Sequence, residues 1–417
     1  MDYLEKRVIV LGLGRSGRAA RDFLMRRGAT VIGYDDHSPC EREEDIFCER
    51  YDFGVVSPGI PLSHRAVVRL KESGVPILSE LDLAYINCPS DRIFAISGTN
   101  GKTTACSILH KMLSEVGRSH LVGNVGVPMI GEVERIGRRD FVVTEISSFQ
   151  IEQSSLFRAK VAALTNVGED HLDRHRDRET YQRIKLSLPE KGEIKVINAD
   201  DPNERAIQGA IRYSQKDESA DFFLKERVIY HRGKGYPLPV LSRGAAYDLD
   251  FLCAFACAAS LLGGEKKFLS LYDKVEIPLY RNQRIGTLCG AEVINDSKGT
   301  NIDATLFAAS AVTRPYAIIL GGSDKGEDYS RLMEGLKNAE RLYLTGANAG
   351  DLYFAADGET KRRCRLMSDV ESCVRDFVRD PLSVLLFSPA SASFDRYRNY
   401  EERGKDFYDI VEKYRNH

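Results

Sequence analysis

Residues 97–104 have the composition of a loop that binds nucleotide phosphates. They read Ser-Gly-Thr-Asn-Gly-Lys-Thr-Thr and stand between an apolar segment expected to form a strand and a segment expected to form a helix. Glycines let backbone amides approach phosphate oxygens, while a lysine and a hydroxyl contact the transferring phosphate and Mg²⁺. Lys102 and Thr103 fit these two roles, so the pattern predicts an ATP site. Ile96 stands where the usual loop has its first glycine, and the competing interpretation is a glycine-rich turn with a solvated lysine.

A carboxylate follows the strand expected at 141–144. Glu145 would lie at the carboxyl end of that strand, which is where ligands bind in parallel α/β sheets. It is therefore a candidate ligand of Mg²⁺. By itself, Glu145 is equally compatible with a surface carboxylate that caps a helix.

Two histidines follow the strand expected at 162–165. His171 and His175 have the spacing of two zinc ligands on a helix, but Leu172 takes the position of the glutamate in the H-E-x-x-H pattern. We therefore expect His171 to be a ligand of a hard ion beside phosphate and His175 to be exposed. Lys185 follows a helical segment and by itself would be interpreted as a surface lysine.

Three successive α/β patterns position these residues. The first has an apolar strand at 8–11, then Gly12-x-Gly14-x-x-Gly17, and a strand at 30–34 that ends at Asp35; the second and third begin near residue 92 and after Pro278. Such alternation predicts parallel sheets with right-handed crossovers. The predicted fold class is α/β, with a Rossmann-like domain at 1–90, a P-loop ATPase-like parallel sheet at 91–277 and a second Rossmann-like domain at 278–417.

The composition indicates a soluble globular protein. The 417 residues are 43% hydrophobic and 29% charged, with a net charge of −2 that favours neither nucleic acid nor an anionic membrane as a partner. The nine cysteines are scattered without a C-x-x-C pair, which is typical of reduced thiols in the cytosol. No apolar run approaches the roughly 20 residues that a bilayer requires. We expect a cytoplasmic protein, and a monomer.

Seven segments, in order, resemble the motifs of the Mur ligases of peptidoglycan precursor synthesis, and specifically of the members that add D-glutamate. The resemblance runs from Val8 to Phe407. The segments are 98–104, 123–126 (G-N-V-G), 145–150 (E-I-S-S-F-Q), 166–173 (N-V-G-E-D-H-L-D), 294–301 (I-N-D-S-K-G-T-N), 321–325 (G-G-S-D-K), and 388–395 (S-P-A-S-A-S-F-D) with Arg403-Gly404.

The resemblance implies ATP-dependent coupling of D-glutamate to UDP-N-acetylmuramoyl-L-alanine through an acyl phosphate. It assigns catalysis to Lys102, Glu145, His171 and Lys185, and two Mg²⁺ ions to Thr103, Glu145, His171 and Lys185, the last of which the family carries as a carbamate. It assigns ATP to Gly98, Thr99, Asn100, Gly101, Lys102, Thr103, Thr104, Arg281 and Asp296. It assigns the other substrates to Arg15, Ser16, Asp36, Gly59, Asn124, His171, Lys298, Thr300, Lys325, Ser393, Phe394 and Tyr400.

Some positions depart from the family pattern. Residues 247–251 read Y-D-L-D-F where the family has H-N-x-x-N beside adenine, Leu279-Tyr280-Arg281 replaces P-H-R, and Asp36-His37 stands where the family often has Thr-Arg. The contacts to adenine and to UDP are therefore expected to differ.

Four alternatives remain. A Mur ligase for another amino acid is the nearest, although the D-N-P-R of the diaminopimelate-adding enzymes is absent here. Folylpolyglutamate synthetases share the loop but lack a domain like 1–90. An NAD-dependent dehydrogenase would explain only the glycine pattern and Asp35, and a non-catalytic nucleotide-binding protein would follow if the altered adenine segment abolishes turnover.

Overall fold

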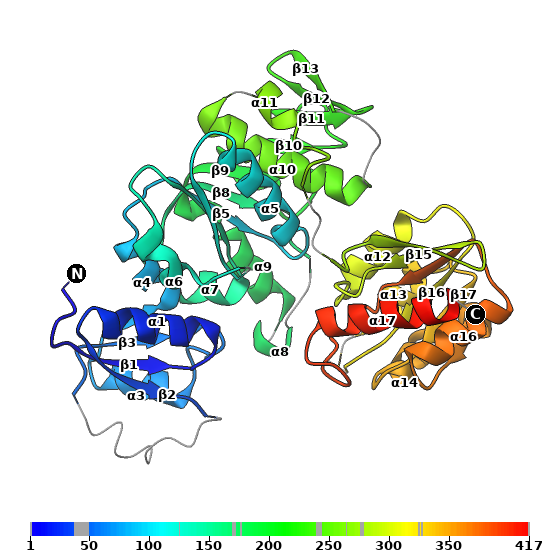
Figure 1. The fold of residues 1–417 in the computed structure, drawn as a ribbon, viewed down its shortest axis with the longest axis horizontal. Helices are drawn as coiled ribbons and strands as arrows, with labels where there is room; N and C mark the ends of the chain where they lie inside the picture. Colours follow the sequence, from blue (N-terminus) through cyan, green and yellow to red (C-terminus); the bar gives the residue numbers. More distant parts are fainter. Residues whose placement is uncertain are drawn as a thin grey trace. The chain divides into compact units, whose positions relative to one another are not determined.

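A computed structural model of the chain describes residues 2–36, 50–124, 126–168, 172–175, 177–238, 244–263, 265–275, 279–323, 326 and 328–415 (Figure 1). The chain forms two compact units. The first consists of 1–168, 177–243 and 247–275, and the second consists of 169–176, 244–246 and 276–417. Each unit is described by itself.

The first unit begins with a four-stranded parallel sheet in the order β2-β1-β3-β4. Its strands are β1 (Arg7–Leu11), β2 (Thr30–Tyr34), β3 (Phe53–Val56) and β4 (Ile77–Ser79). Its helices are α1 (Arg15–Arg26), α3 (Arg65–Glu72) and α4 (Glu80–Asn87). Helix α1 starts directly after Gly14 because Gly12, at φ +84°, turns the chain out of β1, and it buries Ala20, Phe23 and Leu24 against the sheet.

A nine-stranded sheet forms the rest of the first unit, in the order β13-β12-β11-β10-β9-β8-β5-β7-β6. The strands are β5 (Ile93–Ser97), β6 (Ser119–Gly123), β7 (Phe141–Glu145), β8 (Ala159–Leu164), β9 (Gly192–Asn198), β10 (Ile211–Ser214), β11 (Phe222–Lys225), β12 (Val228–His231) and β13 (Lys234–Pro237). Strands β5 to β11 pair in parallel, and β12 and β13 add an antiparallel edge that the sequence did not predict. Strand β5, which lies between β8 and β7, is buried along its whole length, which places its carboxyl end inside the unit.

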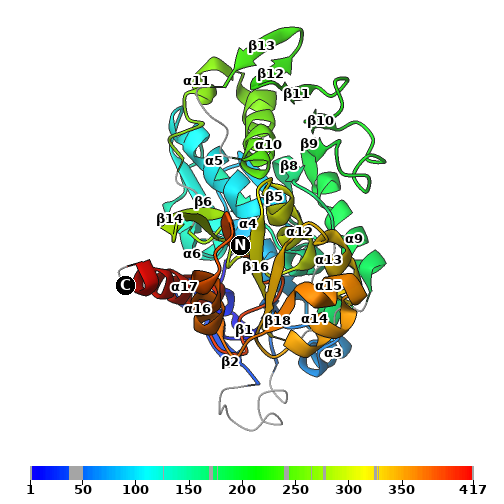
Figure 2. The ribbon, with the colours of Figure 1, turned by 90° about the vertical axis from the view of Figure 1, so that its right-hand side faces the viewer.

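The helices of residues 102–269 are α5 (Lys102–Ser114), α6 (Met129–Glu132), α7 (Ser148–Gln153), α8 (Leu172–His175), α9 (Arg178–Leu186), α10 (Ala245–Leu262) and α11 (Glu265–Leu269). Helices α5 and α10 lie beside the strands of the nine-stranded sheet (Figures 1 and 2). Helix α10 is long and apolar enough to cross a membrane, but residues 251–258 are fully buried, so it is explained as a core helix.

Buried carboxylates of α4 join the first sheet to the second. Asp82 accepts hydrogen bonds from the Ser154 hydroxyl at 2.8 Å and from the amides of residues 155–157 at 2.9 to 3.0 Å. Glu80 accepts the amide of Ile130 at 3.0 Å, and its other oxygen has no partner among the described residues. Burial raises the pKa of Glu80 to about 7, although the hydrogen bond from Ile130 lowers it in part.

The second unit contains a six-stranded sheet in the order β14-β15-β19-β16-β17-β18, parallel except between β14 and β15. The strands are β14 (Gln283–Leu288), β15 (Ala291–Asn295), β16 (Tyr316–Leu320), β17 (Arg341–Leu344), β18 (Cys364–Leu366) and β19 (Val384–Phe387). The helices are α12 (Ile302–Ser310), α13 (Ser330–Gly335), α14 (Ala349–Ala355), α15 (Gly358–Arg363), α16 (Val370–Arg379) and α17 (Tyr400–Arg415). Two apolar clusters cover the sheet. The prediction of α/β folding around three largely parallel sheets is confirmed, while the exact domain limits at 90 and 277 stay a prediction.

Candidate active site

The loop between β5 and α5 depends on two glycines with positive φ. Gly98 has φ +150° and Gly101 has φ +80°. A Cβ at Gly98 would lie 1.9 Å from the Thr165 hydroxyl oxygen, and a Cβ at Gly101 would lie 2.1 Å from a carboxylate oxygen of Asp250. Both positions therefore exclude a larger residue, for conformational and for steric reasons.

Two ammonium groups meet at the carbonyl oxygen of Gly98. Lys102 donates to this oxygen and to the carbonyl of Thr99, both at 2.8 Å. Lys185 donates to the same Gly98 oxygen at 2.7 Å and to the Ser97 hydroxyl at 3.1 Å. Lys185 is 2% exposed, so its interpretation as a surface lysine is wrong. Two cations beside one loop favour the binding of an anion there.

Glu145 is buried at the end of β7, next to β5 in the sheet. Its two oxygens accept hydrogen bonds from the Thr103 hydroxyl at 2.7 Å and from the Asn124 side-chain amide at 2.8 Å. The alternative of a surface carboxylate is wrong for this residue. A carboxylate and a hydroxyl are oxygen ligands of the kind that hard ions such as Mg²⁺ prefer.

The loop after β8 holds the phosphate loop from the other side. The Asn166 side chain accepts the amide of Asn100 at 2.9 Å and donates to its carbonyl at 3.0 Å, and the Asn166 carbonyl accepts the amide of Thr99 at 2.8 Å. The Thr99 hydroxyl lies 3.0 Å from the hydroxyl of Tyr181, a buried residue one helical turn before Lys185. The backbone amides of the first turn of α5 follow this loop directly. Amides in the first turn of a helix have no acceptor within their own helix, so they can donate hydrogen bonds to phosphate.

Histidine ligands stay untested. His171 lies outside the described residues, and within the described ranges no group of three or more His, Cys, Asp or Glu residues is placed to hold a metal. His175 is 2% exposed, which corrects the expectation that it is solvent-exposed.

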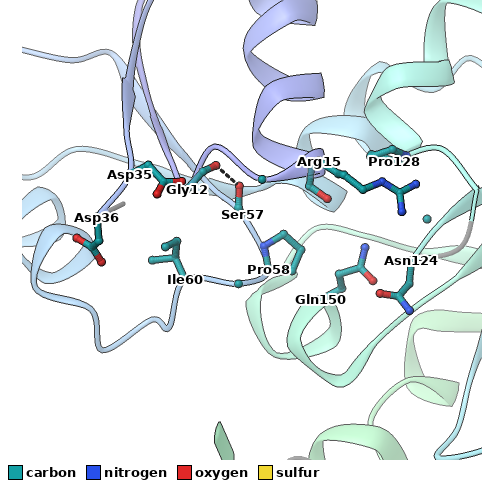
Figure 3. Close-up of a pocket in the computed structure, with 14 residues that line it drawn as sticks. Gly12, Arg15, Asp35, Asp36, Ser57, Pro58, Ile60, Asn124, Pro128 and Gln150 are labelled. Carbon is teal, nitrogen blue, oxygen red and sulfur yellow. Dashed lines mark hydrogen bonds between the residues drawn. The ribbon is translucent and has the colours of Figure 1, made fainter. Parts of the chain in front are cut away.

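A pocket of about 430 Å³ lies between the glycine turn after β1 and the segment after β6. It brings together five of the predicted substrate residues, from positions up to 109 apart in the sequence: Arg15, Ser16, Asp36, Gly59 and Asn124. Figure 3 shows Asp36 at one end of this pocket and Asn124 at the other. Their roles in binding stay predictions.

The two aspartates after β2 have different partners. Asp35 accepts the amide of Leu13 at 2.6 Å and so braces the glycine turn itself. Asp36 accepts the Tyr34 hydroxyl at 2.8 Å and lies 2.9 Å from His64 Nε2. These hydrogen bonds, that of Tyr34 first, hold the pKa of Asp36 below its ordinary value, which favours the ionised form at neutral pH.

The residues that stand in place of the family's adenine segment form hydrogen bonds and packing contacts within the first unit. Asp248 accepts from the Arg227 guanidinium at 2.9 Å and from the Tyr272 hydroxyl, and the Tyr247 hydroxyl donates to the Tyr272 carbonyl at 2.8 Å. Phe251 is fully buried. These residues therefore form a packed cluster that attaches α10 to Arg227, which lies in the turn between β11 and β12.

In the second unit, Asp296 lies at the carboxyl end of β15. It accepts the Asn282 amide at 3.0 Å and the Ser388 hydroxyl at 2.7 Å. Burial raises the pKa of Asp296, and these hydrogen bonds offset part of the rise, so that its pKa is about 6.

The other described residues predicted for this unit belong to the segments before β14, after β15 and after β19. The Lys298 ammonium group lies 4.9 Å from the centre of the Tyr400 ring. Ser393 is buried, whereas Phe394 next to it is 74% exposed. Arg281 and Thr300 belong to the segments before β14 and after β15, and Lys325 lies outside the described residues.

The sequence reasoning gave no role to Arg403, which holds these loops together. Its guanidinium donates to the hydroxyl and carbonyl of Ser297 at 3.1 and 2.8 Å and to the carbonyl of Ala392 at 3.1 Å. The side chain is 2% exposed, and burial lowers the pKa of Arg403 to about 10, so it stays charged at neutral pH. Its place in the Arg-Gly pair of the last motif was the only signal in the sequence.

Comparison with known proteins agrees with this geometry. Residues 96–248 match the family model of the Mur ligase middle domain. The chain is 34% identical to a UDP-N-acetylmuramoylalanine–D-glutamate ligase of Pelotomaculum thermopropionicum, with 98% of each chain covered. It is 32% identical to the ligase of the same name from Caldicellulosiruptor bescii, over 99% of this chain and 98% of that one. The chain belongs to the Mur ligase family.

Solved structures agree on the fold of this Mur ligase. The UDP-N-acetylmuramate–alanine ligase MurC of Thermotoga maritima superposes with a TM-score of 0.64 at 15% identity, covering 98% of this chain and 100% of that one. A MurF ligase of Thermotoga maritima in complex with ADP gives a TM-score of 0.64 at 16% identity, covering 99% and 96%. Full-length relatives named as D-glutamate ligases confirm the predicted family and disfavour the dehydrogenase and folylpolyglutamate alternatives.

Proposed function

We propose that this Mur ligase joins D-glutamate to UDP-N-acetylmuramoyl-L-alanine with ATP as the phosphoryl donor, in the cytoplasmic synthesis of peptidoglycan precursors. The observation that carries the proposal is the chain of contacts from the pocket to the phosphate loop. Asn124 lines the pocket and holds Glu145, and Glu145 accepts the hydroxyl of Thr103 on the first turn of α5. One end of a substrate bound in the pocket would thus lie next to the phosphates of ATP bound at the loop.

The chemistry requires two anions to meet. The substrate carboxylate attacks the γ-phosphorus of ATP, ADP leaves, and an acyl phosphate forms. The neutral amine of D-glutamate then attacks the acyl carbon and its nitrogen loses a proton to solvent. The tetrahedral intermediate collapses to the amide as the C–O bond breaks and phosphate leaves. Lys102 and the amides at the start of α5 offset the charge of the phosphates and fix their position, which is the main protein contribution in phosphoryl transfer.

The residues present fit Mg²⁺ because they supply buried oxygen ligands next to the loop. Thr103 and Glu145 would hold the ion, together with His171 if the family pattern applies. Bound there, Mg²⁺ would neutralise phosphate charge and so lower the barrier by several kcal/mol.

Lys185 is proposed to act beside the same loop, as the amine or as its carbamate. Its ammonium group lies on the carbonyl of Gly98, within the unit and away from solvent. A carbamate forms when the neutral amine adds CO₂ and loses a proton, which would turn a cation into an anionic oxygen ligand. Mass spectrometry of the intact protein in bicarbonate buffer, with Lys185→Arg as control, tests for this group.

The second unit is proposed to receive the amino acid and to contribute to nucleotide binding. Arg281 and Asp296 would contact ATP, and Lys298, Thr300, Lys325 and Ser393 would hold D-glutamate, whose two carboxylates suit the two lysines. We further propose that the protein works as a monomer.

The test is phosphate release from ATP in the presence of UDP-N-acetylmuramoyl-L-alanine while the amino acid is varied. Release that depends on D-glutamate, with the ligated product seen by mass spectrometry, is expected. Release that occurs only with L-alanine, glycine or a diamino acid would reassign the enzyme within the family, and no amino-acid dependence would refute the proposal.

A further inference from the structure

Helix α7 connects the candidate reaction centre to one wall of the pocket. It spans Ser148–Gln153 and begins shortly after Glu145, the carboxylate that holds Thr103. Its last residue, Gln153, is 9% exposed and contacts residues 57–60, which follow β3 in the first sheet. All four residues of 57–60 line the pocket, and we call this segment the pocket wall.

The side-chain amide of Gln153 donates to three backbone carbonyls of the pocket wall. Its Nε2 lies 2.6 Å from the carbonyl oxygen of Ile60 and 3.4 Å from those of Ser57 and Pro58. These partners are 93 to 96 positions away in the sequence. With the amide turned the other way, its oxygen would face three carbonyl oxygens, so this position requires a donor.

The amide oxygen of Gln153 indicates that the residue is present for its donor. Oε1 is buried and has no hydrogen-bond partner among the described residues. A buried acceptor without a partner costs free energy, and an apolar side chain of the same length would avoid that cost. The N–H group must therefore supply something that an apolar side chain cannot, and its observed contacts are with the pocket wall.

The residues after α7 give this contact a fixed base. The carboxylate of Asp82 accepts the hydroxyl of Ser154 at 2.8 Å and the amides of residues 155–157 at 2.9 to 3.0 Å. The Lys191 ammonium group donates to the carbonyl of Ser154 at 2.7 Å. Gln153 therefore holds the pocket wall from a segment that is itself bonded on two sides.

A ligand in this pocket would touch the wall and the residues of the second sheet together. Figure 3 shows Pro58 and Ile60 of the wall among the lining residues, with Gln150 of α7 and Asn124 of the segment after β6. Both groups can contact one ligand only when they lie at the right separation. The contact of Gln153 with the wall sets this separation.

We propose that Gln153 is a positioning residue, which ties the pocket wall to α7 so that the uridine-nucleotide substrate meets both sides of its pocket. This inference rests on the proposed function. Gln153 is not among the described residues that line the pocket, so it acts through the wall and not by touching the substrate. Without its donor, the wall takes up the binding geometry for a smaller fraction of the time. The apparent dissociation constant then rises in inverse proportion to that fraction.

The experiment compares Gln153→Met with Glu152→Met, the same substitution at the exposed residue before it. Methionine keeps the unbranched shape of glutamine but has no N–H donor. Dissociation constants for UDP-N-acetylmuramoyl-L-alanine and for ATP are measured by calorimetry, and kcat by D-glutamate-dependent phosphate release. We expect Gln153→Met to weaken binding of the uridine nucleotide roughly tenfold, as for one lost hydrogen bond, and to leave ATP binding unchanged. The kcat at saturation should also stay unchanged, because bound substrate itself holds the wall in place.

Gln153→Glu is the second variant. It keeps the side-chain length but puts an anionic oxygen against three carbonyls, so its loss of binding should exceed that of Gln153→Met. If this variant does not fold, Gln153→Met carries the test by itself.

Two results would overturn the inference. One is wild-type affinity for the uridine nucleotide in Gln153→Met, or an equal loss in Glu152→Met. The other is a lower melting temperature and kcat with unchanged affinity, which is the result of a merely structural role. Wild-type enzyme without D-glutamate-dependent phosphate release would instead refute the proposed function, so the two failures are distinguishable.

Discussion

Glu145→Gln should separate the charge of the buried carboxylate from its role in the fold. Glutamine has the same shape, and with its oxygen toward Asn124 and its amide toward Thr103 it can keep both hydrogen bonds seen at 2.8 and 2.7 Å. Two charged hydrogen bonds become neutral, but a buried charge also disappears, so these terms offset each other. We expect the free energy of unfolding to change by no more than about 1 kcal/mol.

Catalysis should suffer much more than stability. Replacing an anionic oxygen ligand with a neutral one weakens charge neutralisation at the phosphates, and a loss of about 3 kcal/mol of transition-state stabilisation lowers the rate by more than a hundredfold. The assay is D-glutamate-dependent phosphate release across a titration of MgCl₂, with thermal unfolding measured in parallel. The Mg²⁺ concentration for half-maximal rate should rise.

The matched control is Glu152→Gln, an exposed carboxylate on α7. It should leave both the rate and the Mg²⁺ dependence unchanged. The reasoning is refuted if Glu145→Gln retains the wild-type rate, or if its loss of rate is accompanied by an equal loss of folded protein.

Two further predictions concern stability and a third concerns nucleotide binding. Because burial raises the pKa of Glu80 to about 7, the folded state holds a proton that the unfolded state releases near pH 4.5. The contribution of Glu80 to stability should therefore fall by about 3 kcal/mol as pH rises from 4.5 through 7. Glu80→Gln should reduce the loss of stability over this pH range by about that amount in calorimetry, and an unchanged slope would contradict the prediction. Arg403→Met leaves the buried carbonyls of Ser297 and Ala392 without their donor. We therefore expect the free energy of unfolding of the second unit to fall by about 3 kcal/mol and the KM for D-glutamate to rise. A variant with the stability and KM of the wild-type protein would contradict this. Gly101→Ala should abolish ATP binding, measured by calorimetry, because its Cβ would lie 2.1 Å from a carboxylate oxygen at a positive φ; wild-type affinity would refute that.

Much of the fold follows from local patterns in the sequence. Strand β2 (Thr30–Tyr34) was predicted with the bounds that the structure has, because short apolar runs between turn residues determine buried parallel strands. The phosphate loop was also predicted from a local pattern, because its glycines, lysine and hydroxyl groups lie within one short segment. The antiparallel edge β12–β13 was not predicted, because each strand has only four residues and β13 contains glycine and proline.

The candidate site was harder to predict from the sequence where hydrogen-bonded residues are far apart in the chain. Lys185 bonds to Ser97, 88 residues away, and only the packing of α9 on the sheet shows that it is buried. Arg403 bonds to Ser297, 106 residues away, and no local pattern predicts that a charged side chain will be enclosed by carbonyl groups. The family resemblance supplied a role for Lys185 but none for Arg403.

The transfer of oxygen from substrate to phosphate tests the central claim most directly. UDP-N-acetylmuramoyl-L-alanine labelled with ¹⁸O in its terminal carboxylate is turned over with ATP and D-glutamate, and the released inorganic phosphate is analysed by mass spectrometry. If the carboxylate is phosphorylated next to the loop of Lys102, labelled oxygen must appear in the phosphate. Inorganic phosphate free of label, released together with ligated product, would contradict the account.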